Sequence, residues 1–139
     1  MKSTAPVTTP DNVSIRVLIV DDMPQVRDDL RVLLQLSNGI EVVGEAANGN
    51  EAIRQAELLN PDVVIMDLEM PLLDGLQATR QIKQRKLAKK IVVLSVHSDL
   101  EVKEQAIQAG ADDFILKGSP YHSLIESIHP SQPHIGEIK

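Results

Sequence analysis

Carboxylate, hydroxyl and amino side chains follow directly after the apolar runs of this chain. Oxygen ligands without histidine or cysteine in the pattern suit Mg²⁺, or Mn²⁺ as the alternative. A lysine and a hydroxyl aimed at the same place can hold the oxygens of a phosphoryl group. Brought together, such side chains can perform metal-dependent phosphoryl chemistry. They are Asp21 and Asp22 after residues 17–20, Asp67 after 63–66, Ser95 after 91–94 and Lys117 after 114–116.

The run 63–66, which leads into Asp67, indicates how these side chains are positioned. Its apolar residues do not alternate with polar ones, which is typical of a strand buried on both faces of a parallel sheet. The carboxyl ends of parallel strands lie at one edge, where open α/β folds bind their ligands. A carboxylate beside an apolar core is costly unless it is paired or metal-bound. Asp67 therefore needs the other groups at that edge.

Strand-like and helix-like patterns alternate along the chain. Asp21 or Asp22 is predicted to cap the first helix, and Ser98 or Asp99 to cap the fourth. The alternation predicts right-handed crossovers and an α/β fold, in which helices cover both faces of a parallel sheet. The predicted strands are residues 16–20, 41–46, 63–66, 91–95 and 114–116.

The composition narrows the classes of function. At 139 residues the chain has the length of one domain, and Phe114 and Tyr121 are its only aromatic residues. A formal charge of −6 and the lack of base-stacking side chains disfavour nucleic-acid binding. Without cysteine, disulfides and thiol catalysis are excluded. No apolar run reaches membrane-spanning length and no signal peptide is present, so we expect a soluble, cytoplasmic protein without membrane contact.

Both ends of the chain differ from its middle. Residues 1–14 are rich in serine, threonine and proline and are predicted to be a disordered lead-in. Pro130 and Pro133 end the last helical pattern, so residues 130–139 are predicted to form a loose tail. One domain is thus expected over residues 15–129.

The order of the polar motifs resembles the receiver domain of bacterial two-component response regulators, over about residues 15–128. This resemblance implies a flavodoxin-like, doubly wound sheet of five parallel strands in the order 2-1-3-4-5. The motifs that carry it are Asp21-Asp22, Met66-Asp67-Leu68-Glu69-Met70-Pro71 with Asp74-Gly75, Ser95, Gly110-Ala111-Asp112 and Lys117.

The resemblance also implies roles at the site. Asp67 would accept a phosphoryl group from a phosphohistidine on a sensor histidine kinase or a phosphotransfer protein. Lys117 and Ser95 would each bind one phosphoryl oxygen. The implied Mg²⁺ ligands are Asp22 and Asp67 directly, Asp21 mainly through water, and the backbone carbonyl of Glu69.

Ser95 and Phe114 match the family's switch positions, through which phosphorylation alters the surface of the fourth helix, fifth strand and fifth helix and can promote homodimerisation. Phe114 lacks the hydroxyl of the tyrosine that many members carry, so such a switch would act by packing. Ser95-Val96 and Lys117-Gly118 are more typical of receivers that carry a LuxR-type helix-turn-helix output. No such output follows within these 139 residues, which leaves either a single-domain regulator or a segment of a larger one.

The same residues allow other interpretations. A Mg²⁺-dependent phosphohydrolase usually has a second aspartate two residues after the nucleophile, where this chain has Glu69. A receiver-like scaffold that is not phosphorylated would not require the complete set of polar groups. Phe114 can be a plain core aromatic, and His97 either tunes dephosphorylation or is a solvated loop residue. The favoured hypothesis is a phosphorylatable signalling switch that is not an enzyme.

Overall fold

The computed structural model describes residues 14–70 and 74–129. The predicted tail, and the predicted lead-in up to residue 13, lie outside these ranges, so those predictions stay untested. The strands are β1 (Ile15–Val20), β2 (Ile40–Ala46), β3 (Val63–Asp67), β4 (Lys90–Ser95) and β5 (Asp113–Leu116). The helices are α1 (Pro24–Gln35), α2 (Gly49–Leu59), α3 (Gly75–Gln84), α4 (Leu100–Ala109) and α5 (Tyr121–Ile128). In the described part of the chain, no helix combines the length and apolarity that crossing a membrane requires.

The five strands form one parallel sheet in the order β2-β1-β3-β4-β5. This confirms the predicted flavodoxin-like fold and its strand order. In the register, Asp67 of β3 lies opposite Leu94 of β4, and Ser95 lies opposite Leu116 of β5. The carboxyl ends of β3, β4 and β5 therefore meet at one edge of the sheet.

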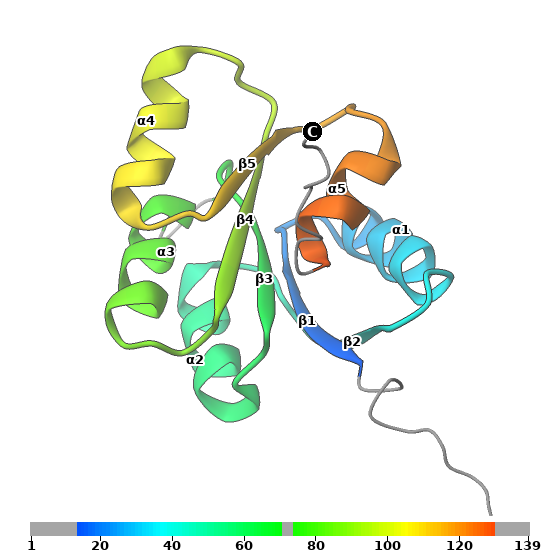
Figure 1. The fold of residues 1–139 in the computed structure, drawn as a ribbon. Helices are drawn as coiled ribbons and strands as arrows, with labels where there is room; N and C mark the ends of the chain where they lie inside the picture. Colours follow the sequence, from blue (N-terminus) through cyan, green and yellow to red (C-terminus); the bar gives the residue numbers. More distant parts are fainter. Residues whose placement is uncertain (1–13, 71–73, 130–139) are drawn as a thin grey trace, which may run out of the picture.

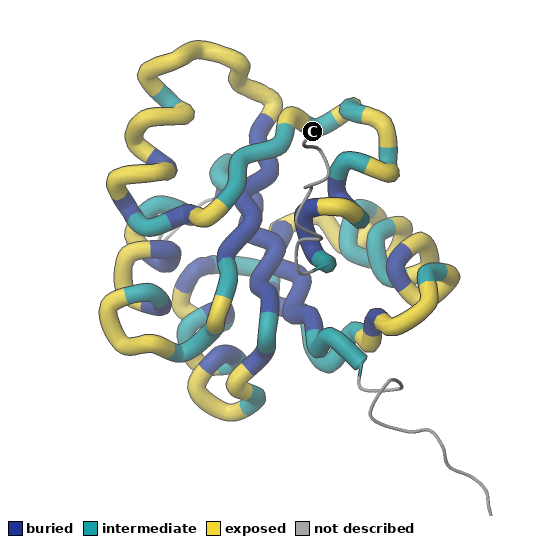
Figure 2. The backbone as a smooth tube through the Cα atoms, in the orientation of Figure 1, coloured by how far each residue is buried: buried dark blue, intermediate teal, exposed yellow. Residues whose placement is uncertain are grey.

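Helices cover both faces of the sheet, with α1 and α5 on one face and α2, α3 and α4 on the other (Figure 1). Figure 2 shows the central strands β1, β3 and β4 as the most buried part of the chain, whereas the edge strands β2 and β5 are mostly of intermediate burial. Burying one large aliphatic side chain contributes about 1.5–3 kcal/mol, which explains why unbroken apolar runs form the central strands. On the first face the core includes Ile19, Leu34, Ile65, Leu124 and Ile128; on the second it includes Leu18, Val64, Ala52, Ile82 and Ala106.

Two helix starts differ from the prediction. Met23, not an aspartate, occupies the N-cap of α1, and no side chain caps this helix. Pro24 lies in the first turn, where its missing N–H costs nothing. Asp99 does occupy the N-cap of α4, but its side chain makes no capping hydrogen bond. Only the backbone position of the α4 cap was therefore predicted correctly.

Gly75, the first residue of α3, lies against the end of β3. A Cβ atom added there would come within 2.4 Å of the carbonyl oxygen of Asp67 and 3.0 Å of the Cα atom of Leu68. Both neighbours are backbone atoms that cannot move aside without shifting the strand. Glycine is therefore required at position 75, because any larger residue would clash with the strand backbone. Asp74, just before it, caps α3 by accepting a hydrogen bond from the Gln77 N–H at 2.9 Å.

Candidate functional site

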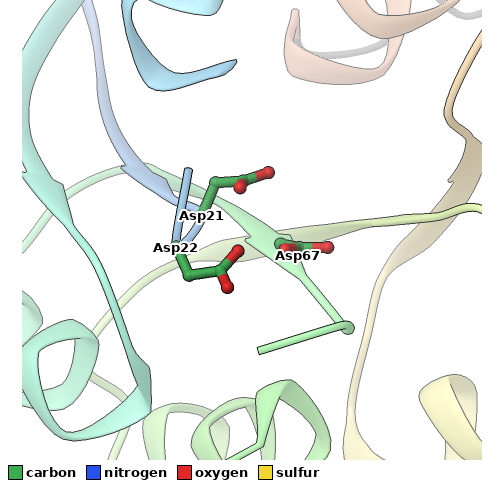
Figure 3. Close-up of side chains that lie close together, drawn as sticks. All are labelled: Asp21, Asp22 and Asp67. Atoms are coloured by element: carbon green, nitrogen blue, oxygen red, sulfur yellow. The ribbon is translucent and has the colours of Figure 1, made fainter. Parts of the chain in front are cut away.

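Three aspartates gather where β1 and β3 end. Figure 3 shows Asp21, Asp22 and Asp67 side by side at this edge of the sheet. Each offers a carboxylate oxygen, and these oxygens all lie within 4.8 Å of one another. Asp21 and Asp67 are each only 1% exposed, whereas Asp22 is exposed. The cluster is thus mostly withdrawn from water and open on the side of Asp22.

Lys117, directly after β5, compensates the two buried carboxylates. Its Nζ atom lies 2.9 Å from Asp67 Oδ1 and 3.4 Å from Asp21 Oδ2. The Lys117 N–H donates to the carbonyl oxygen of Ser95 at 2.8 Å, which fixes the start of the lysine side chain. Burial alone would lower the pKa of Lys117, but its hydrogen bond and charge interaction with Asp67, together with the charge of Asp21, raise it above 10.5. The lysine is therefore held as a cation.

Backbone N–H groups hold the two buried carboxylates in place. Asp21 Oδ1 accepts a hydrogen bond from the Met23 N–H at 2.9 Å, and Asp67 Oδ1 accepts one from the Glu69 N–H at 3.1 Å. Arg27 of α1 donates from Nη1 to the carbonyl oxygen of Asp21 at 2.7 Å and from Nε to Glu45 of β2 at 3.0 Å. The Asp21 carboxylate is thus occupied by the Met23 N–H and by Lys117 at the sheet edge, which explains why it does not cap α1.

Ser95 is fully buried at the end of β4 and hydrogen bonded on both sides. Its Oγ donates to Glu69 Oε2 at 2.9 Å and accepts from the His97 N–H at 3.0 Å. The His97 Nε2 atom lies 3.6 Å from the same carboxylate oxygen, and its ring is about half exposed. Sequence reasoning placed Ser95 and His97 at this edge, but it gave no role to the Glu69 side chain.

Phe114 lies in β5, half-buried against the α2–α3–α4 side of the core. It also lines a surface pocket of about 380 Å³, together with Ser98, Lys103 and Ser119. The aromatic ring therefore belongs neither wholly to the core nor wholly to the surface, which leaves both of its predicted roles open.

The acidic cluster fits a hard divalent cation. Its donor atoms are all carboxylate oxygens, which hard cations prefer. Two of the three carboxylates are buried beside like charges, and this repulsion favours the uptake of a cation or a proton. Asp21, Asp22 and Asp67 are the side chains that could hold the ion, and a site of few carboxylate oxygens suits Mg²⁺, which keeps several of its waters.

A family model of the response regulator receiver domain matches residues 17–129 of the chain. The chain belongs to this family. The matched residues include every site residue described above, and receiver domains are signalling switches of two-component systems. As a group they interact with histidine kinases or phosphotransfer proteins.

The receiver domain is similar to regulators of the LuxR type, as its motifs predicted. The nitrate/nitrite response regulator protein NarL of Escherichia coli K12 is 36% identical over 122 residues, which are 88% of this chain and 56% of NarL. A two-component response regulator of the LuxR family from Aurantimonas sp. SI85-9A1 has a TM-score of 0.78 at 36% identity, covering 83% of this chain and 82% of that one. The receiver domain of the putative regulator NarL from Mycobacterium tuberculosis has a TM-score of 0.79 at 31% identity, covering 84% and 94%. The chain spans a little over half the length of the curated relatives it matches.

We expect Asp21 to make the stability of the metal-free receiver depend on pH. Burial raises the pKa of its carboxyl above 3.8, the Asp67 charge raises it further, and the contacts with Met23 and Lys117 only partly oppose this. A raised pKa in the folded state means that the stabilising contribution is fully present below about pH 3.8, where the carboxyl is protonated, and is lost as the pH rises through the folded value. We therefore expect Asp21→Asn to increase the free energy of unfolding at neutral pH without Mg²⁺.

The measurement is urea unfolding of both proteins between pH 4 and pH 7 in EDTA. The advantage of the Asp21→Asn variant should grow as the pH rises. An advantage that is constant or shrinks with rising pH would contradict the burial of a charged Asp21.

Proposed function

We propose that this receiver takes a phosphoryl group onto Asp67 from a sensor histidine kinase or a phosphotransfer protein. One observation carries the proposal: a carboxylate only 1% exposed lies 2.9 Å from a lysine ammonium, beside two further carboxylates, at the carboxyl edge of a parallel sheet. Incubation with acetyl phosphate and Mg²⁺, followed by intact-mass measurement, tests it. The protein should gain the mass of one phosphoryl group.

In the proposed reaction an Asp67 carboxylate oxygen attacks phosphorus. A new P–O bond forms as the bond from phosphorus to the donor breaks, and the donor leaves with that electron pair. The contacts with Lys117 and the Glu69 N–H both fall on Oδ1, so we assign the attack to Oδ2. Lys117 then pairs with one oxygen of the transferred phosphoryl group and offsets its charge. The Ser95 hydroxyl donates a hydrogen bond to another of these oxygens.

We assign the metal site to Asp21, Asp22, Asp67 and the backbone carbonyl of Glu69, with Mg²⁺ as the ion and Mn²⁺ as a substitute. When bound, the ion offsets the charge that builds up between the attacking carboxylate and the phosphoryl oxygens. Asp22 is the exposed member of the cluster and approaches the site from the open side.

We expect Asp22→Ala to abolish Mg²⁺ binding while the fold remains intact. The exposed carboxylate is not part of the core, and removing it also relieves repulsion in the metal-free state. Isothermal titration with Mg²⁺ measures the effect. Asp29→Ala, which removes an exposed carboxylate on α1 away from the cluster, is the matched control and should bind Mg²⁺ normally. Unchanged affinity in Asp22→Ala would contradict the metal assignment.

Ser95 and Phe114 are proposed to pass the phosphorylated state to the surface formed by α4, β5 and α5. Movement of the Ser95 hydroxyl toward the phosphoryl group would vacate space into which Phe114 turns, and small shifts between two packed arrangements suffice to alter a partner's affinity. The pocket beside Phe114 lies on this surface. A second receiver, meeting this one in a homodimer, is the proposed partner there.

Beryllofluoride, which mimics a phosphoryl group on a carboxylate, should therefore shift NMR signals more strongly over residues 96–110 and 113–124 than over α2 (Gly49–Leu59). Phe114→Ala should keep the signals of bound beryllofluoride at Asp67 and lose most of the distant shifts. If the largest distant shifts fall on α2 instead, the α4–β5–α5 surface is not the output face.

The remaining assignments follow from the same function. We propose a cytoplasmic signalling switch over residues 15–129 that acts on no external substrate and itself binds neither nucleic acid nor membrane. The formal charge of −6 supports the exclusion of nucleic acid from this segment.

A further inference from the structure

The side chain of Glu69 engages the groups that a phosphoryl group on Asp67 would need. Its Oε2 atom accepts the Ser95 hydroxyl at 2.9 Å, and its Oε1 atom lies 3.9 Å from Lys117 Nζ. A carboxylate presents two acceptor oxygens, as a phosphoryl group presents three. Glu69 thus places an internal anion beside both proposed phosphoryl ligands.

The hydroxyl of Ser95 cannot serve both anions at once. A serine hydroxyl has one proton to donate, and here that proton is directed to Glu69. The acceptor side of the same oxygen is used by the His97 N–H at 3.0 Å, so rotation of the hydroxyl would also disturb this contact. A phosphoryl oxygen can receive the Ser95 proton only after Glu69 has released it.

The second oxygen of Glu69 is poorly held. Oε1 is buried and has no hydrogen-bond partner among the residues that the structure describes, since Lys117 Nζ is beyond hydrogen-bonding distance at 3.9 Å. A buried acceptor without a partner is costly, which makes this arrangement of Glu69 easy to displace. The side chain as a whole is 30% exposed, so water can receive it when it swings out.

We propose that the Glu69 carboxylate holds the Ser95 hydroxyl in the unphosphorylated receiver and must be displaced before the site can bind a phosphoryl group fully. This inference rests on the proposed function of Asp67. Glu69 is a positioning residue that acts through Ser95, in addition to the metal ligation proposed for its backbone. The apparent affinity for a phosphoryl group is then the intrinsic affinity multiplied by the fraction of molecules in which Ser95 is free, so a small free fraction weakens binding.

Beryllofluoride titration of the full chain at saturating Mg²⁺ tests the proposal. Glu69→Ala frees Ser95 and should tighten beryllofluoride binding by about tenfold, the scale of one competing hydrogen bond to a charged group. Glu69→Gln is the matched control, because it removes the charge but retains an oxygen that can accept the Ser95 proton. It should tighten binding by clearly less. Equal gains in the two variants would show that charge alone acts, and would overturn the proposal.

A double-mutant comparison locates the effect at Ser95. In a Ser95→Ala background the gain from Glu69→Ala should shrink markedly, because the contested hydroxyl is absent. A gain that persists in full overturns the proposal, as does a native protein that binds beryllofluoride as tightly as Glu69→Ala. Those results leave Asp67 phosphorylation intact. If neither the native protein nor Glu69→Ala binds beryllofluoride or takes a phosphoryl group, the proposed function itself fails, and this inference with it.

Discussion

Asp67→Asn will take no phosphoryl group from acetyl phosphate under conditions in which the native chain gains one. The amide nitrogen and oxygen of asparagine are poor nucleophiles, so the variant has lost the reacting group and not merely its charge. The fold should survive, because the side chain keeps its shape and its oxygen can still accept from the Glu69 N–H, seen at 3.1 Å in the native protein. Removing one buried anion also relieves repulsion on Asp21.

Intact-mass measurement over a time course with Mg²⁺ gives the result directly. Asp99→Asn is the matched control, since Asp99 is exposed and makes no capping hydrogen bond with its side chain. The control should be phosphorylated like the native chain. A one-phosphate adduct that persists in Asp67→Asn would place the nucleophile at another residue.

Lys117→Met should show the second large effect, on both stability and phosphorylation. The substitution leaves two carboxylates, each 1% exposed, without their compensating cation. Breaking such a buried pair by removing one partner typically costs about 3 kcal/mol in the free energy of unfolding. The rate of phosphorylation should fall by about 10²–10³, the usual loss when one group that stabilises developing negative charge is removed.

Urea unfolding with and without Mg²⁺ separates the two effects. Because an ion that binds only the folded state stabilises it, Mg²⁺ should recover part of the lost stability in Lys117→Met but should not restore the rate. Lys103→Met, which changes an exposed lysine of α4, is the control and should match the native chain in both stability and phosphorylation rate. A Lys117→Met variant as stable as the native chain without Mg²⁺ would mean that the buried aspartates are protonated and not paired.

The sequence predicted the strands well because apolar runs are local. The run 63–66 gave β3 to within one residue, and the ends of β1 and β4 were placed correctly, because the unbroken apolar runs of strands buried on both faces stop where the strands reach the edge of the sheet. The meeting of Asp21, Asp22, Asp67 and Lys117 followed from the parallel topology. For this reason these contacts, which join residues up to 96 positions apart, could be anticipated.

Contacts made by side chains across loops could not be predicted in this way. Glu69 was given only a backbone role, because its bond to Ser95 depends on how two loops at the sheet edge lie against each other. Arg27 was missed because its partner Glu45 is 18 residues away on β2. The expected aspartate cap of α1 failed for a related reason: Asp21 is drawn to Lys117, and a local capping pattern cannot reveal a competing long-range partner.

The contact between Gly75 and the end of β3 gives Asp67 surroundings of unequal stiffness. On the α3 side, backbone touches backbone, and not even a methyl group would fit between Gly75 and the Asp67 carbonyl. Elsewhere at the same sheet edge, side chains such as Ser95 and Glu69 are joined by hydrogen bonds, which can change partners. Movement of Asp67 toward α3 is therefore resisted by backbone atoms, whereas these side chains can rearrange. If Asp67 is phosphorylated as proposed, we expect the resulting displacement to fall on these side chains and not on α3. Gly75, which takes no part in the proposed chemistry, would then set its direction.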